Sequence, residues 1–208
     1  MIKRMNDVRF NKILLSVNAL VPLALLFFDA FRGRLGANPI EFFLRATGVL
    51  TLTFLLVTLA VTPLRRLTGR NDLVKYRRML GLYAFFYAVL HLVTYSIFDK
   101  SLDLPAIVGD VIQRPFIAVG MLALVLLIPL AVTSTNAWVK RLGGKNWAKL
   151  HKLSYPIAIL GVLHFWMIVK SDVFYPAIFG VILMGLLGWR AINFFSNKQN
   201  ERSRRAVS

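Results

Sequence analysis

Cysteine is absent from this sequence of 208 residues. Its absence excludes disulfide bonds, iron–sulfur clusters and thiol chemistry. Long polar segments are also missing, because every segment between the apolar runs is shorter than 20 residues. There is no glycine-rich dinucleotide loop after a strand and no Walker phosphate loop. The sequence therefore leaves no room for a soluble nucleotide-binding domain.

Hydrophobic residues are abundant instead, at 57% of the chain, with a mean hydropathy of +0.63. Uncharged apolar runs recur at residues 13–28, 46–64, 79–98, 115–139, 153–169 and 173–189. Most approach the roughly 20 residues that a helix needs to cross a bilayer. They are solidly apolar and do not alternate as the strands of a membrane barrel do. The sequence predicts an all-α membrane protein.

We expect a single domain over residues 1–208, built as a bundle of six transmembrane helices at about 12–31, 42–63, 79–98, 115–135, 150–169 and 173–194. The first run follows a basic start, so a cleaved signal peptide is the alternative there. A retained helix is favoured, because the run is long, contains Pro22 and lacks a small-x-small cleavage site.

Acidic residues are scarce, at 9 against 26 lysines and arginines. Six helices place 20 of these basic residues on one side of the membrane, with three acids, and six basic residues on the other, with six acids. The entire net charge of +17 therefore lies on one face. The positive-inside rule makes that face, and both termini, cytoplasmic. Topology and anionic lipid explain the high isoelectric point, and no nucleic-acid partner is expected.

Histidine is equally scarce, and His91, His151 and His164 all lie in or at the edge of expected membrane helices. Each could simply join two helices by a hydrogen bond. Depth favours a function, because His91 lies about 20 Å along the third helix and His164 about 19 Å beyond His151 on the fifth. Both helices run outward, and each carries the tripeptide VLH. Two imidazoles at one level, without the further ligands of a zinc site, fit axial ligation of haem iron.

Three segments carry a resemblance to a known family: "KYRRMLGLYAFFYAVLH", "TSTNAWVKRLGGKNWAKLHKLSYPIAILGVLHFW" and the weaker "VTPLRR". The chain resembles the ferric-reductase-like transmembrane domain, in which histidines 13 or 14 residues apart hold haems between helices. It is most similar to the short form without a dehydrogenase domain, the haem-binding membrane subunit of bacterial protein-methionine-sulfoxide reductase systems.

The resemblance implies an electron-transfer subunit of the bacterial inner membrane. Electrons would pass from the quinone pool through haem b to a periplasmic molybdopterin-containing methionine sulfoxide reductase, with which the subunit forms a heterodimer. That partner would carry the catalysis and repair oxidised periplasmic proteins. The resemblance also implies FMN binding.

Two haems need four axial ligands, and three histidines supply three. His91 and His164 predict one haem, and His151 is the candidate ligand of a second. Arg77 lies 14 residues before His91 and about 40° round the helix from it. It could contact lipid phosphate, pair with a haem propionate, or act as an unusual ligand opposite His151. His151 and His164 are turned about 140° apart on an ideal helix, unless Pro156 changes the rotation between them.

A six-helix transporter or proton pathway without haem is the alternative function. Three features count against it: the VLH repeat lies on parallel helices, the histidines lie away from the midplane, and carboxylates are lacking at the midplane. Among the small residues, Gly81 and Gly161 are expected to leave room for a flat macrocycle, or to allow close helix packing.

Overall fold

The computed structural model describes residues 2–169 and 171–207, and this part of the chain is helical with no strand. Its longer helices are α1 (Ile2–Phe31), α2 (Pro39–Thr68), α3 (Val74–Thr94), α5 (Pro115–Val132), α8 (Ser154–Ile168) and α9 (Phe174–Val207). Three shorter helices connect them: α4 (Leu104–Gln113), α6 (Asn136–Leu142) and α7 (Gly144–Leu150). The predicted all-α class is confirmed. Lys170, which the charge count placed on the outer side, lies outside the described residues.

Five of the described helical segments are long and apolar enough to cross a membrane: Asp7–Phe31, Pro39–Thr68, Asn71–Asp99, Pro115–Val132 and Phe174–Ser196. The sixth predicted span, 150–169, forms as α8, which has 15 residues and is therefore about 22 Å long. It begins later than expected because His151–Leu153 form a 3₁₀ turn. The last helix is longer than the predicted 173–194, because its tail is rich in good helix formers and has no proline.

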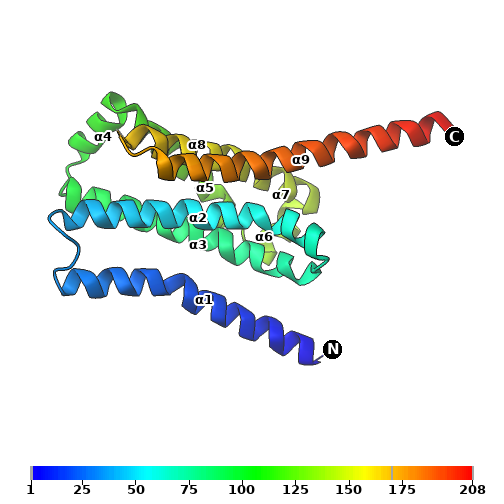
Figure 1. The fold of residues 1–208 in the computed structure, drawn as a ribbon, viewed down its shortest axis with the longest axis horizontal. Coiled ribbons are helices and arrows are strands. Elements are labelled where there is room, and N and C mark those ends of the chain that lie inside the picture. The colour runs from blue at the N-terminus through cyan, green and yellow to red at the C-terminus, as the bar shows by residue number, and fades with distance from the viewer. Residues whose placement is uncertain (1, 170, 208) are drawn as a thin grey trace.

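Two antiparallel helix pairs form the centre of the fold. α2 packs most extensively on α3, and α5 packs most extensively on α8. The pairs join through contacts of α3 with α5 and of α2 with α8, while α9 covers α8 and α2. Figure 1 shows α1 at the edge of this bundle. The N-terminal end of α1 and the C-terminal end of α9 lie at the same side.

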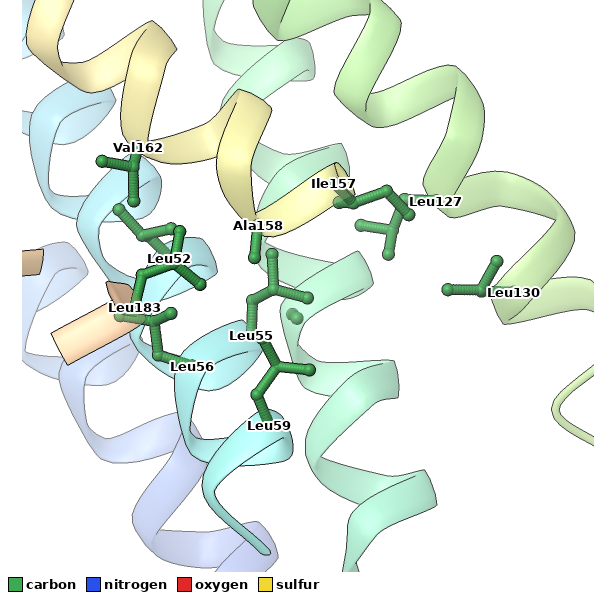
Figure 2. Packing of buried hydrophobic residues seen from close by; sticks show 11 residues of the cluster. Leu52, Leu55, Leu56, Leu59, Leu127, Leu130, Ile157, Ala158, Val162 and Leu183 are labelled. Carbon is green, nitrogen blue, oxygen red and sulfur yellow. The ribbon is translucent and has the colours of Figure 1, made fainter. Parts of the chain in front are cut away.

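The core lies where the two pairs meet. Leu55 and Leu59 of α2, Ala84 of α3 and Ala158 of α8 are all at most 3% exposed. They belong to one buried cluster that also takes side chains from α5 and α9, shown in Figure 2. The two alanines let the helix backbones come close, as small residues do in membrane bundles.

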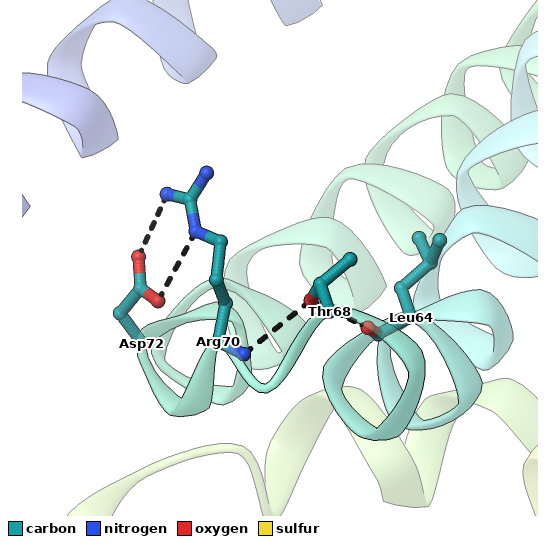
Figure 3. A network of polar contacts seen from close by, with 4 residues as sticks. All are labelled: Leu64, Thr68, Arg70 and Asp72. Atoms are coloured by element: carbon teal, nitrogen blue, oxygen red, sulfur yellow. Dashed lines mark hydrogen bonds and ion pairs between the residues drawn. The ribbon is translucent and has the colours of Figure 1, made fainter.

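The turn between α2 and α3 shows how the chain reverses at one end of the bundle. α2 ends at Gly69, whose φ of 69° is the left-handed conformation that glycine adopts without strain. Thr68 Oγ1 donates to the Leu64 carbonyl at 2.7 Å and accepts from the Arg70 amide at 3.4 Å. Arg70 also pairs with Asp72 at 3.0 Å (Figure 3). The turn is thus capped by its own polar groups.

The segment at 99–114, which lies between the expected membrane helices at 79–98 and 115–135, contains α4. Asp103 caps this helix by accepting from the Ala106 amide at 3.1 Å. Asp110 is buried, because Lys100 Nζ approaches its carboxylate at 2.6 Å and the Tyr95 hydroxyl donates to it at 2.8 Å. The hydrogen bond from Lys100, which has the larger effect, and the one from Tyr95 hold the pKa of Asp110 below its ordinary value. The carboxylate therefore ties α4 to the end of α3.

Candidate haem site

His91 lies on α3 with its ring turned toward α2. Its Nδ1 lies 3.0 Å from the Leu44 carbonyl oxygen and 3.4 Å from Thr47 Oγ1. The Thr47 hydroxyl already donates to the carbonyls of its own helix. Both partners near Nδ1 therefore act as acceptors, and α2 holds this edge of the imidazole.

His164 repeats the arrangement on α8. Its Nδ1 lies 2.6 Å from the Phe116 carbonyl oxygen of α5. Phe116 is the second residue of α5, so the contact lies close to the end of that helix. In each helix pair, a histidine on one helix is held by a backbone carbonyl of the other.

These contacts fix the protonation of both rings. A backbone carbonyl can only accept a hydrogen bond, so each Nδ1 carries the proton. Each Nε2 then has a free lone pair, and no hydrogen bond to either Nε2 occurs within the described residues. An imidazole whose Nδ1–H is bound to a carbonyl is the usual form of a metal-ligating histidine. Both rings are therefore ready to coordinate through Nε2.

The two rings lie close together and nearly perpendicular. Their centroids are 6.2 Å apart, and their planes make an angle of 87°. With metal–nitrogen bonds of about 2 Å, two imidazoles on opposite sides of one metal ion have ring centres roughly 6 Å apart. The residues present fit a pair of axial ligands. No group of three His, Asp or Glu side chains suited to hold a bare metal ion occurs in the described part of the chain.

A glycine faces each histidine ring from the partner helix. A Cβ atom added to Gly48 of α2 would lie 3.4 Å from Cε1 and Nδ1 of His91. A Cβ on Gly120 of α5 would lie only 2.7 Å from Cε1 of His164. Each glycine comes four residues after the carbonyl that holds the ring, in the related stretches ATGVL and AVGML. The glycines allow each ring to approach the backbone that orients it.

The small residues named from sequence have other surroundings. A Cβ on Gly81 would meet Thr58, and one on Gly161 would meet Leu52, so neither glycine faces a histidine ring. Gly48 and Gly120 were not predicted from the sequence. The available signal was the repeated A-x-G-x-L pattern, which occurs once in the helix that packs most extensively against each VLH helix.

His151 is held differently from the other two histidines. Its Nε2 lies 3.1 Å from Thr133 Oγ1, which itself donates to the Pro129 carbonyl. Trp147 stacks on the ring, with centroids 3.9 Å apart and planes 26° apart. Since the threonine hydroxyl has only one proton, His151 donates through Nε2 in this arrangement. The ring would have to leave Thr133 to offer that nitrogen to iron.

Arg77 shares the charged neighbourhood of His151 without contacting it. The positive charges of Arg77 and Arg78 both act on His151, and Arg190 acts on Arg77. Arg77 forms no hydrogen bond or ion pair with any described residue. The structure thus brings His91 and His164 together and places Arg77 near His151 without joining the two.

A 3₁₀ turn separates His151 from the helix that carries His164. His151 starts the 3₁₀ turn, and Pro156 lies in the first turn of α8, where a missing N–H costs no helical hydrogen bond. His151 and His164 therefore do not lie on one regular α-helix, and the 140° offset of an ideal helix does not apply to them.

The sequence of this chain also matches a known protein family. The family model for "Ferric reductase like transmembrane component" matches residues 45–162, more than half of the chain and including His91 and His151. A protein of Herminiimonas arsenicoxydans is 54% identical over 178 residues, which cover 85% of this chain and 82% of that protein. A protein of Xanthomonas oryzae pv. oryzae is 46% identical over 212 residues, or 99% and 97% of the two chains.

Both proteins carry the name "Protein-methionine-sulfoxide reductase heme-binding subunit MsrQ". A third protein of that name, from Ralstonia nicotianae, is 51% identical over 174 residues, covering 83% of this chain and 80% of its own. With such identity over most of both lengths, the chain belongs to the MsrQ family of ferric reductase like transmembrane components.

Proposed function

We propose that this protein is a haem-containing, electron-transferring membrane subunit of a methionine sulfoxide reductase system. The observation that carries the proposal is the pair His91 and His164. Both rings are held at Nδ1 by backbone carbonyls, and their centres lie 6.2 Å apart. The names of the MsrQ relatives agree with a haem-binding role.

His91 and His164 are the proposed axial ligands of one haem b. When bound, haem supplies a centre that accepts and releases single electrons. The carbonyls of Leu44 and Phe116 hold the two rings in the required tautomer and make Nε2 more basic.

A second haem is proposed at His151, with Arg77 either as its unusual ligand or as the partner of a propionate. The shared electrostatic neighbourhood of the two residues supports this assignment. A guanidinium stays protonated and is a poor ligand for iron, which favours the propionate role. Binding through Nε2 would require His151 to exchange its contact with Thr133 for the iron.

We further propose six membrane crossings in the bacterial inner membrane, with both termini cytoplasmic. Five long apolar helices, the apolar α8 and the common side of both chain ends support this count (Figure 1). The segregation of basic residues supports the orientation.

The partners remain those that the family resemblance implies. Quinone is the proposed electron donor, and a periplasmic molybdopterin-containing subunit is the proposed acceptor and the site of sulfoxide reduction. FMN is a proposed additional cofactor on the same ground. We propose no catalytic residue for sulfoxide reduction in this chain.

The visible spectrum of the purified full-length protein tests the haem proposal. We expect His91→Ala and His164→Ala each to remove the same haem, because one clamp needs both sides. His151→Ala should leave that haem spectrum intact and acts as the matched control. A colourless parent protein would favour the transporter alternative, and loss of different spectral species in the two variants would show that the pairing is wrong.

A separate pair of variants tests the second haem. Arg77→Lys keeps the positive charge and should insert normally, but a lysine cannot replace the two fixed donors of the guanidinium. We expect the variant to lose or shift the same haem as His151→Ala, measured as haem per protein and by redox titration. Parent-like values in both measurements would leave Arg77 as a topology residue only.

A further inference from the structure

We propose that a groove between α1 and α3 binds one anionic phospholipid at the end of the bundle where the chain termini lie. The groove has a volume of about 280 Å³ and is lined by Lys12, Val74, Lys75, Arg78, Met79 and Leu82. In this proposal the phosphate group of the lipid contacts the three cationic side chains of the lining. One acyl chain lies along the apolar ones.

The shape of the groove follows from the path of α1. Ser16 of α1 contacts Met79 Sδ at 3.5 Å, and farther along the Tyr87 hydroxyl donates to the Ala19 carbonyl at 2.5 Å. From these contacts toward its N-terminus, α1 diverges from α3, and Pro22 lies inside the bent helix (Figure 1). The groove lies beside these contacts, since Met79, which meets Ser16, lines it, and so does Lys12, about one turn before Ser16 on α1.

Charge selects the kind of ligand. None of the six lining residues is acidic. Lys12 and Lys75 form no ion pair with any described residue, and the Arg78 guanidinium donates only to the neutral amide of Asn136, at 2.6 Å. Asp72 is near enough for its charge to interact with that of Lys75, but it lies outside the lining and is paired with Arg70 at 3.0 Å. The lining itself therefore gathers three cations and no carboxylate. A phosphate anion complements this group, and a basic cluster at a membrane surface attracts anionic lipid headgroups.

The apolar half of the lining selects an amphiphile over a free anion. Val74 is 44% exposed and Leu82 is 39% exposed, both facing outward from α3. Phe86, one turn farther along, is 39% exposed and continues the same apolar stripe. An inorganic phosphate would leave these side chains uncovered, whereas an acyl chain would cover them. The ligand therefore combines a phosphate head with a long apolar tail.

Lipid retention by the haem-loaded full-length protein tests this proposal. The protein is exchanged into mixed vesicles of phosphatidylglycerol and phosphatidylcholine with identical acyl chains, purified in detergent, and analysed by native mass spectrometry. We expect one phosphatidylglycerol to be retained in preference to phosphatidylcholine. Lys12→Gln with Lys75→Gln should weaken its retention roughly 25-fold, since each cation near a lipid surface contributes about a factor of five.

Two further variants separate the groove from general charge. Lys145→Gln with Lys149→Gln removes the same charge from α7, outside the groove, and should leave retention unchanged. Leu82→Trp keeps every cation but fills the apolar slot, and should reduce retention. Haem content serves as the folding control for all variants.

Several results would overturn the proposal. These are equal retention of the two lipids, an equal loss in the α7 control, or parent-like retention in Leu82→Trp. The phosphate chemistry could also come from a mononucleotide, so the released material is examined for flavin fluorescence. Release of flavin in place of lipid would assign the groove to a nucleotide and likewise reject the phospholipid.

Discussion

Replacement of Gly120 by alanine should remove the haem that we propose at His91 and His164, although the added methyl group lies on a helix that carries neither histidine. The new Cβ would lie 2.7 Å from Cε1, 2.8 Å from Nδ1 and 3.3 Å from Cγ of His164. Optimal carbon contacts are about 3.5–4.0 Å. The ring must therefore move by roughly 0.8 Å or more, beyond the about 0.5 Å that a preorganised site tolerates.

The displacement acts on the bond that orients the ring. His164 Nδ1 lies only 2.6 Å from the Phe116 carbonyl, one turn before Gly120 on the same helix, so a ring pushed away from α5 stretches this bond. Loss of a contact that orients a metal ligand typically costs about 10–100-fold in metal affinity. We expect Gly120→Ala to lose most of this haem at the concentrations used in purification.

Gly48→Ala is the matched control for this prediction. Its Cβ would lie 3.4 Å from His91, a tight contact that a shift of a few tenths of an ångström relieves. We expect it to keep most of its haem. The assay is haem per protein with the redox midpoint potential, and thermal unfolding monitors the fold. Equal haem content and potential in Gly120→Ala and the parent, or a greater loss in Gly48→Ala, would refute the reasoning.

Three further predictions concern the rest of the bundle. Lys100 and Tyr95 lower the pKa of Asp110, so its stabilisation of α4 should be present above the ordinary value of 3.8 and lost as pH falls through the lowered pKa. Loss of amide hydrogen-exchange protection in α4 at acidic pH, and in Asp110→Asn at neutral pH, would show it. Arg190 Nη2 donates at 2.5 Å to the carbonyl of Leu59, which has no helical partner because Pro63, four residues later, lacks an N–H. Arg190→Met should therefore lower the thermal midpoint of unfolding. Pro63→Ala in the same protein should restore most of the loss, and no recovery would contradict this account. A reporter fused to the C-terminus or inserted at 69–71 should be cytoplasmic, and a periplasmic signal from either would contradict the proposed topology.

Much of the helical fold could be predicted because a bilayer imposes a simple requirement on sequence. Uncharged runs near the length of a crossing located the long helices to within a few residues in most cases. The same requirement says nothing about short helices outside the membrane, so neither α4 nor the burial of Asp110 could be predicted from it. That burial depends on Tyr95 and Lys100, which only the folded chain brings to Asp110.

Part of the candidate site could also be predicted, because depth along parallel helices is a matter of counting residues. That count placed His91 and His164 at one level, and the centroids of their rings lie 6.2 Å apart. Their role as ligands stays a prediction. The count could not show which way a ring is turned. The contacts at Nδ1 come from backbone carbonyls, which every residue has and no sequence pattern marks. The same limit applies to His151, whose contact with Thr133 depends on the turn before α8.

The repeated geometry explains why the two histidines share one level. In each helix pair the glycine follows the supporting carbonyl by four residues, and the histidine follows the glycine by 43 residues in one pair and 44 in the other. The two pairs run in the same direction, so the repeat delivers both rings to the same end of the bundle, on facing helices. An inverted repeat, as in many transporters, would have placed them at opposite ends. A parallel repeat suits a flat cofactor that is held from both faces, which agrees with the role that we propose for His91 and His164.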